Sequence, residues 1–182
     1  MTMKKLILIL IAFSTLSASA QVSKITLQAS GLTCSMCNNA ISKALKTLPY
    51  AESVKTDIKN ASFDIIVKPG SKPSFDEIKR KVEGAGFSVA SMKVTMKFDN
   101  TSVQNNEHVN ADGFTFHFLN VKDQLLNGEQ TIQILDKGFV SAKTFAKNAV
   151  YTKMDCYKTG VAGTCCTKAG LSAGTRIYHV TI

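Results

Sequence analysis

The stretch Gly31-Leu32-Thr33-Cys34-Ser35-Met36-Cys37 holds two cysteines separated by two residues, and the hydrophobic period changes across it. Before the stretch, apolar and polar residues alternate from Ser23 to Ala29, which is typical of a half-buried strand. After it, apolar residues recur at helical spacing as far as Leu48, and Pro49 stops the pattern. The sequence therefore predicts that the two cysteines lie in a loop between a strand and a helix.

Three more strands are expected before residue 99. Residues 54–58 and 63–67 alternate in the same way and are separated by the turn-like pair Lys59-Asn60, which predicts a hairpin. Residues 87–98 alternate again, but the phase shifts near Ala90. We therefore expect an irregularity at that point of the last strand.

A second helix is expected between the hairpin and the last strand. Ser74 followed by Glu77 forms a capping box at its start, and Gly86 is placed to end it. Residues 21–98 thus have the order βαββαβ. Two helices on one face of four antiparallel strands form the ferredoxin-like arrangement, so the predicted fold class is α+β.

The rest of the chain is expected to form a small, mostly β domain over residues 109–182, after a polar linker or exposed hairpin loop at 99–108. Alternation from Phe114 to Phe118 predicts a strand. Ser141 is expected to cap a short helix, and residues 155–175 are interpreted as a loop because they are rich in Gly, Thr, Ala and Cys. Further strands are expected at residues 130–135 and 176–182.

Residues 1–20 are expected to be a secretory signal peptide and not part of the fold. Lys4 and Lys5 give a basic start, residues 6–13 are apolar but too few to span a bilayer, and Ala18-Ser19-Ala20 supplies small residues before Gln21. An uncleaved membrane anchor is the alternative. No later stretch is apolar enough to span a membrane, so we expect a soluble protein exported to the periplasm or the cell exterior.

The composition fits an exported globular protein. Apolar residues make up 45% and charged residues 19% of the chain, which predicts a packed core. The formal charge is +9, but the lysines are scattered and export argues against nucleic acid, so no nucleic-acid partner is expected. The cysteine count of 5 is odd, so at least one thiol is free, bound to metal or paired with another molecule.

Cys34 and Cys37 are the candidate metal ligands. A helix N-terminus lowers the pKa of a nearby thiol and so favours the thiolate, which is the form that binds metals. The motif holds no carboxylate or histidine, so the expected site is soft and of low coordination number. Two thiolates suit Cu(I) or Hg(II), whereas Zn(II) prefers four ligands. Met36, between the cysteines, is expected to face solvent or to pack.

The motif and the fold order resemble the heavy-metal-associated domain family, as in copper chaperones, copper-transporting ATPases and periplasmic mercury-binding proteins. The family motif Gly-Met-Thr-Cys-x-x-Cys appears at residues 31–37 with Leu32 in place of methionine, and Gly86-Phe87 matches the family's Gly-aromatic pair. We expect Leu32 to keep the apolar role of the methionine. The resemblance implies that Cys34 and Cys37 bind Cu(I), with Hg(II), Zn(II) or Cd(II) as alternatives, and pass it to a partner protein or transporter.

Two other function classes stay open for these cysteines. Cys34 and Cys37 could form a disulfide, which an oxidising compartment favours, and the cysteines would then only stabilise a structural or interaction module. They could also act as a thiol–disulfide oxidoreductase. The motif lacks the Trp-Cys-Gly-Pro-Cys context of thioredoxin, and none of the prolines is placed like its cis-proline. We therefore expect a metal-binding protein that is not an enzyme.

A second group of thiols lies near the C-terminus at Cys156, Cys165 and Cys166. Adjacent cysteines rarely pair with each other because the ring is strained. One disulfide from Cys156 to Cys165 or Cys166 would close a short loop and stabilise a small core. Alternatively, the three thiols form a second soft-metal site, with His179 or Met154 as a further ligand.

The three histidines receive no role of their own from the sequence. His179 is interpreted as a strand residue on a solvent face, and so are His108 and His117. The two cysteine groups in one exported chain lead to the hypothesis of a metal relay or store. In it, the first domain accepts the ion and the second holds it or directs docking.

Overall fold

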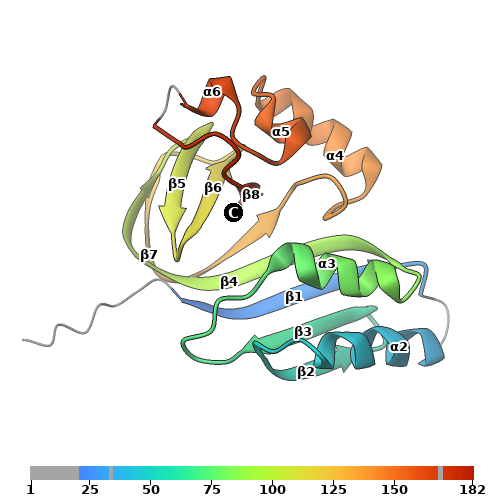
Figure 1. The fold of residues 1–182 in the computed structure, drawn as a ribbon. Coiled ribbons are helices and arrows are strands. Elements are labelled where there is room, and N and C mark those ends of the chain that lie inside the picture. Colours follow the sequence, from blue (N-terminus) through green and yellow to red (C-terminus); the bar gives the residue numbers. More distant parts are fainter. Residues whose placement is uncertain (1–20, 33–34, 168–169) are drawn as a thin grey trace, which may run out of the picture.

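The computed structural model describes residues 21–32, 35–167 and 170–182, and Figure 1 shows their arrangement. The N-terminal half forms the predicted βαββαβ unit, which confirms the ferredoxin-like fold class. Its elements are β1 (Val22–Ser30), α2 (Ser35–Lys46), β2 (Ala51–Asp57), β3 (Ser62–Val67), α3 (Phe75–Gly84) and β4 (Ser88–Val103). The predicted signal peptide lies outside the described residues.

The helix signals read from the sequence are present in the structure. The Ser74 side chain accepts a hydrogen bond from the Glu77 backbone N–H at 3.2 Å and so caps α3. Gly86, with φ +88°, adopts the left-handed conformation that glycine allows just past a helix. The two helices lie against the β1–β4 part of the sheet (Figure 1). Their buried apolar residues are Ile41, Leu45, Phe75, Ile78 and Val82.

All the strands in the described part of the chain belong to one sheet, with the order β2-β3-β1-β4-β7-β8-β6-β5. β1 lies between β3 and β4 and is antiparallel to both. The register of β1 against β4 shifts where Gln28 pairs with Ser91 but Ala29 pairs with Val89. This shift confirms the predicted irregularity near Ala90.

β4 does not end where the linker was expected. It continues to Val103, and β5 (Glu107–Ala111) begins after a short turn, so the prediction of a linker at 99–108 was wrong. The reason is that β4 pairs along its length with β7 (Gln124–Ile134). Backbone groups of a polar segment can be satisfied in a ladder while its side chains face solvent, so polarity alone did not mark a linker.

The remaining elements form the C-terminal half. β6 (Phe114–Phe118) pairs antiparallel with β5 and parallel with β8 (Ile177–Thr181). The other elements are α4 (Ala142–Asn148), the 3-10 turn η1 (Ala149–Tyr151), α5 (Cys156–Thr159) and α6 (Thr164–Thr167). No helix in the described ranges combines the length and apolarity needed to cross a membrane.

Two sequence predictions for this half had different outcomes. Ser141 accepts a hydrogen bond from the Thr144 backbone N–H at 3.1 Å, which confirms it as the cap of α4. The interpretation of residues 155–175 as loop was wrong in part, because α5 and α6 lie within them. Helices of four residues are too short to produce a hydrophobic period.

A continuous core joins the two halves, since residues of β1, α3, β6 and β8 belong to the same buried apolar cluster. Phe75, at the start of α3, stacks on Phe114 of β6 with ring centroids 4.7 Å apart. Phe75 also meets Tyr178 of β8 edge-on at 5.0 Å. These contacts fix the first turn of α3 against the C-terminal strands.

Arg176 connects the same two halves through charge. Its Nε and Nη2 donate to the two carboxylate oxygens of Asp76 at 3.0 and 3.1 Å, and its Nη1 donates to Asp136 at 2.8 Å. Tyr178 Oη also donates to Asp76, at 2.7 Å. Fork-like pairs of this kind are among the stronger hydrogen bonds in proteins.

Candidate functional site

The loop after β1 carries the cysteine motif to the start of α2. Gly31 has φ +81°, a left-handed conformation that favours glycine, and the chain turns there. Leu32 packs against the core, as predicted. Cys37 is half-buried in the first turn of α2 and is disulfide-bonded. Cys34, the other predicted ligand, lies outside the described residues.

The first turn of α2 is a favourable place for a thiolate once the disulfide is reduced. It holds no acidic side chain, and the basic residues Lys43 and Lys46 lie in the last turn. The N–H groups at the start of the helix therefore face Cys37 with a positive potential that no carboxylate cancels. Met36 is 80% exposed, which confirms the prediction that it faces solvent.

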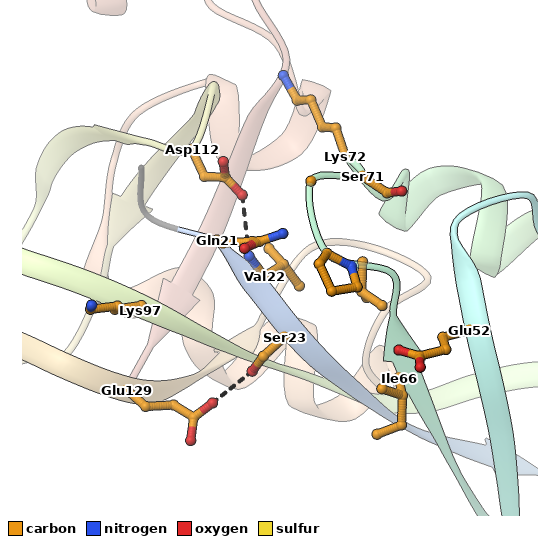
Figure 2. A pocket seen from close by; sticks show the side chains of 13 residues that line it. Gln21, Val22, Ser23, Glu52, Ile66, Ser71, Lys72, Lys97, Asp112 and Glu129 are labelled. Atoms are coloured by element: carbon orange, nitrogen blue, oxygen red, sulfur yellow. Dashed lines mark hydrogen bonds between the residues drawn. The ribbon is translucent and has the colours of Figure 1, made fainter. Parts of the chain in front are cut away.

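A surface pocket of about 860 Å³ lies at the opposite end of β1. Figure 2 shows Val22 and Ser23 beside it, with the Val22 N–H donating to Asp112 and the Ser23 hydroxyl donating to Glu129. The length of a nine-residue strand, about 30 Å, separates this pocket from the motif loop. Neither cysteine nor histidine lines it, so it is not a candidate for soft-metal binding.

The C-terminal thiols are free in the structure. Cys156 begins α5 and is buried, Cys166 in α6 is buried, and Cys165 beside it is half-buried. The Cys165 and Cys166 sulfurs are 3.4 Å apart. Burial raises the pKa of Cys156, and the nearby Cys166 raises it further. Because all three thiols are free, the disulfide that the sequence left open for this group is not formed here.

The three histidines form a row across adjacent strands. His108 of β5 lies opposite His117 of β6, and His117 lies opposite His179 of β8. Residues directly opposite each other point to the same face of a sheet, and the ring centroids are 4.4 Å and 4.9 Å apart along the row. We call these three residues the histidine row.

The burial of the histidine row corrects the sequence interpretation. His117 and His179 are fully buried and His108 is half-buried, so they are not solvent-facing strand residues. Every residue of β6 is buried, because the core covers one face and the α5–α6 segment covers the other (Figure 1). The alternation that predicted this strand cannot show that its more polar face, which carries Thr115 and His117, is covered as well. His108 is close to His117 in the chain, across the turn that joins β5 to β6, but His179 is far away, so no local signal could have found the whole row.

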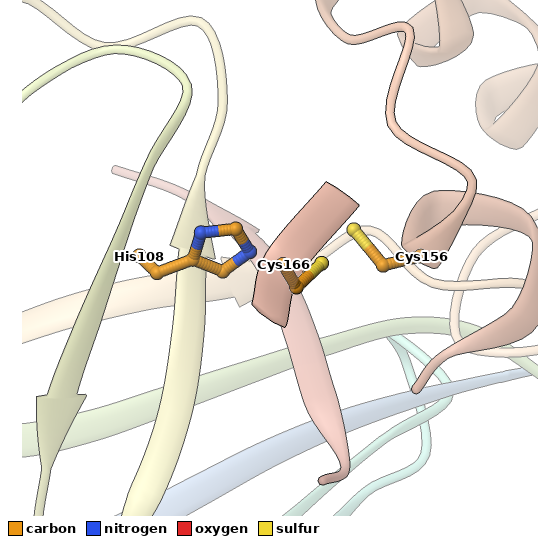
Figure 3. Close-up of side chains that lie close together, drawn as sticks. All are labelled: His108, Cys156 and Cys166. Carbon is orange, nitrogen blue, oxygen red and sulfur yellow. The ribbon is translucent and has the colours of Figure 1, made fainter. Parts of the chain in front are cut away.

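The thiol of Cys156 faces the row. Its Sγ lies 3.4 Å from His179 Nε2 and 3.9 Å from His117 Nδ1. Figure 3 shows Cys156, Cys166 and His108 side by side. The structure thus joins two predicted ligands, Cys156 and Cys166, to His179, which was predicted only as an alternative further ligand, and to His108 and His117, which were not predicted as ligands. Cys165 is in neither of the two ligand groups found among the described residues.

In two rings of the histidine row, the nitrogen that faces away from Cys156 has a hydrogen-bond partner. The His179 Nδ1–H donates to Asp136 Oδ1 at 2.7 Å, and His117 Nε2 lies 3.1 Å from Asn106 Oδ1. The opposite nitrogen of each ring, Nε2 of His179 and Nδ1 of His117, is the one that lies toward Cys156. Burial, together with the neighbouring His179 and His108, lowers the pKa of His117 to about 3, so its ring is neutral at physiological pH.

Comparisons with known proteins find similarity in the N-terminal half. Residues 26–88 match the family model described as the heavy-metal-associated domain. Among solved structures, a CopZ metallochaperone is 24% identical, with 37% of this chain and 100% of that chain covered and a TM-score of 0.35. The yeast copper transporter domain CCC2A is 25% identical, with 36% and 88% covered and a TM-score of 0.33.

A third similar structure is the water-soluble region of the P-type ATPase CopA from Bacillus subtilis. It is 24% identical, with 45% of this chain and 54% of that chain covered and a TM-score of 0.35. No curated protein matches the chain. The family match ends at residue 88, so it includes the cysteine motif and α3 but not the histidine row.

Proposed function

We propose, from the premise that residues 26–88 form a heavy-metal-associated domain, that this protein binds a soft metal ion through Cys34 and Cys37 and transfers or stores it. Cu(I) is the favoured ion, with Hg(II), Zn(II) and Cd(II) as alternatives. The observation that carries the proposal is the family match over the segment in which the motif joins β1 to α2. Softness and low coordination number favour Cu(I) or Hg(II) for two thiolates.

The disulfide at Cys37 would have to be reduced before the motif could bind a metal ion. Cys37 is disulfide-bonded in the structure, whereas a metal ligand must be a thiolate. Two electrons from a thiol reductant would release both sulfurs. A two-coordinate ion also leaves positions open for a thiolate of an incoming protein, so the ion could pass to a partner or transporter by ligand exchange.

The test is an anaerobic Cu(I) titration of the reduced protein against a competing Cu(I) chelator. The parent should retain one more equivalent of Cu(I) than a Cys34→Ser/Cys37→Ser variant. Met36→Leu is the matched control, because Met36 lies between the two cysteines in the sequence but is exposed, and it should leave the stoichiometry unchanged. Equal retention by the parent and the double variant would reject the proposal and favour thiol–disulfide exchange, which an assay with a small disulfide would detect.

Export is a second part of the proposal. It rests on the pattern of residues 1–20, which lie outside the described residues. N-terminal sequencing of the protein recovered from an expressing cell should begin at Gln21. Retention of Met1 in all of the protein would contradict export by cleavage.

A further inference from the structure

Five side chains of ligand type meet between β5–β6–β8 and the short helices. Their donor atoms form two overlapping groups, Cys156 with Cys166 and His108, and Cys156 with His117 and His179, and the atoms within each group lie within 4.8 Å of one another. We propose that this cluster is a second metal site, which binds one divalent ion of the Zn(II) type through Cys156, Cys166 and at least two rings of the histidine row. It does not depend on the function proposed for the N-terminal motif.

The surroundings of the rings already have the form of a metal site. Asp136 Oδ1 lies 2.7 Å from His179 Nδ1 and Asn106 Oδ1 lies 3.1 Å from His117 Nε2, so the other nitrogen of each ring is left toward Cys156. Metal-ligating histidines almost always have such a partner on the other nitrogen, because it fixes the tautomer and the ring orientation. The site would therefore need little rearrangement to accept an ion.

The third ring supplies an independent observation. His108 Nε2 is buried and has no hydrogen-bond partner among the described residues. His108 belongs to the first ligand group with Cys156 and Cys166, and Figure 3 shows a nitrogen of its ring facing Cys166. Leaving a buried polar atom unsatisfied costs about 1–3 kcal/mol. A metal ion at the centre of the cluster would satisfy that nitrogen.

Charge balance selects the class of ion. Cys156 and Cys166 are fully buried, and so are His117 and His179, so a net charge at this place would be costly. Two thiolates neutralise a divalent ion, whereas Cu(I) with two thiolates would leave a buried negative charge. Asp136 is not counted in this balance, because it is no ligand and has its own partners, the ring of His179 and Arg176, which it shares with Asp76. Two thiolates and two imidazoles are also a tetrahedral ligand set that Zn(II) prefers.

The experiment uses the reduced Cys34→Ser/Cys37→Ser protein, so that the N-terminal motif cannot take up the probe. It should bind one equivalent of Co(II), with thiolate-to-cobalt charge-transfer absorption and the intense visible bands of a tetrahedral site, and Zn(II) should displace the Co(II). X-ray absorption of the Zn(II) form should show two sulfur and at least two nitrogen neighbours. No uptake, a first shell without sulfur, or uptake of Cu(I) with rejection of Zn(II) would overturn the proposal.

Single variants in the same background separate ligands from neighbours. Cys156→Ser should abolish the charge-transfer band, whereas Cys165→Ser should keep it. Asn106→Ala should weaken Zn(II) binding by roughly 10–100-fold, because it frees the ring of the ligand His117. Zn(II) should also raise the melting temperature of the background protein by mass action but not that of a folded Cys156→Ser variant. A band and a stabilisation that both survive Cys156→Ser would overturn the assignment.

Discussion

At the scale of single residues, Asp76 is held by groups that come from the far end of the chain. It accepts hydrogen bonds from Arg176 and from Tyr178, and Lys79 lies nearby on α3. Burial alone would raise the pKa of this carboxyl, but the hydrogen bonds from Arg176 and Tyr178 outweigh burial and lower it below its ordinary value. The carboxylate is therefore favoured more in the folded protein than in the unfolded chain.

This balance predicts the pH dependence of an Asp76→Asn variant. Since the folded pKa lies below the unfolded one, the stability from Asp76 is complete above the unfolded pKa, about 4, and is lost as pH falls through the folded pKa. Near neutral pH the variant should lose about 1–2 kcal/mol, because Asp76 remains partly exposed and its ion pairs are partly screened. Urea unfolding at several pH values would measure the difference.

The difference between parent and Asp76→Asn should shrink as the pH falls below about 4. The exposed Asp123 provides the control, since Asp123→Asn should change stability little at any pH. A difference between parent and Asp76→Asn that stayed constant down to pH 3 would show that the charge of Asp76 does not stabilise the fold.

The residues of the two sites differed in how far the sequence could predict them. Cys34 and Cys37 lie in one short motif, so their spacing alone made them candidate ligands, and Cys156 and Cys166 became candidates because they fall in one segment. The histidine row depends on which strands pair, namely β5 with β6 and β6 with β8. The pairing of β5 with β6 is that of a local hairpin, but the pairing of β6 with β8 is a long-range property that hydrophobic periodicity does not encode.

At the scale of elements, α3 carries the contacts that connect the two halves, so its N-cap is a sensitive position. Ser74→Ala removes the 3.2 Å hydrogen bond to the Glu77 N–H and should cost about 1 kcal/mol. The hydrogen bond from Tyr50 Oη goes to the Ser74 carbonyl and should survive. Denaturant unfolding would measure the loss, with Ser53→Ala on the exposed side of β2 as the control.

A loss of stability no larger than that of Ser53→Ala would mean that the cap contributes nothing.

Elements with a clear period or cap, such as α3, α4 and β1, were predicted within a few residues. The extension of β4 and the helices α5 and α6 were missed. In β4, pairing with β7 gives a polar segment its backbone partners. The helices α5 and α6 have four residues each, little more than one turn, so a helical pattern cannot repeat within them.

At the scale of the molecule, the sequence predicted two domains, whereas the strands of both halves share one sheet and one core. Long-range pairing between β4 and β7 is what merges them, and no local pattern specified that β4 would choose β7. Whether the chain divides into two domains at residues 99–108 or shares one core also decides how it unfolds. Domains that share a core have to unfold together, whereas separate domains can unfold at different temperatures.

We therefore predict that the metal-free protein unfolds in a single cooperative transition. Unfolding the C-terminal half alone would expose Phe75 and leave Asp76 without Arg176, and it would also strip β4 of its partner β7. Calorimetry should give equal calorimetric and van't Hoff enthalpies, and fluorescence of the tyrosines in both halves should change at the same temperature. Two resolved transitions would instead show that the halves are energetically separate domains, and the contacts of Arg176 and Phe75 would then count for little in the stability of the whole.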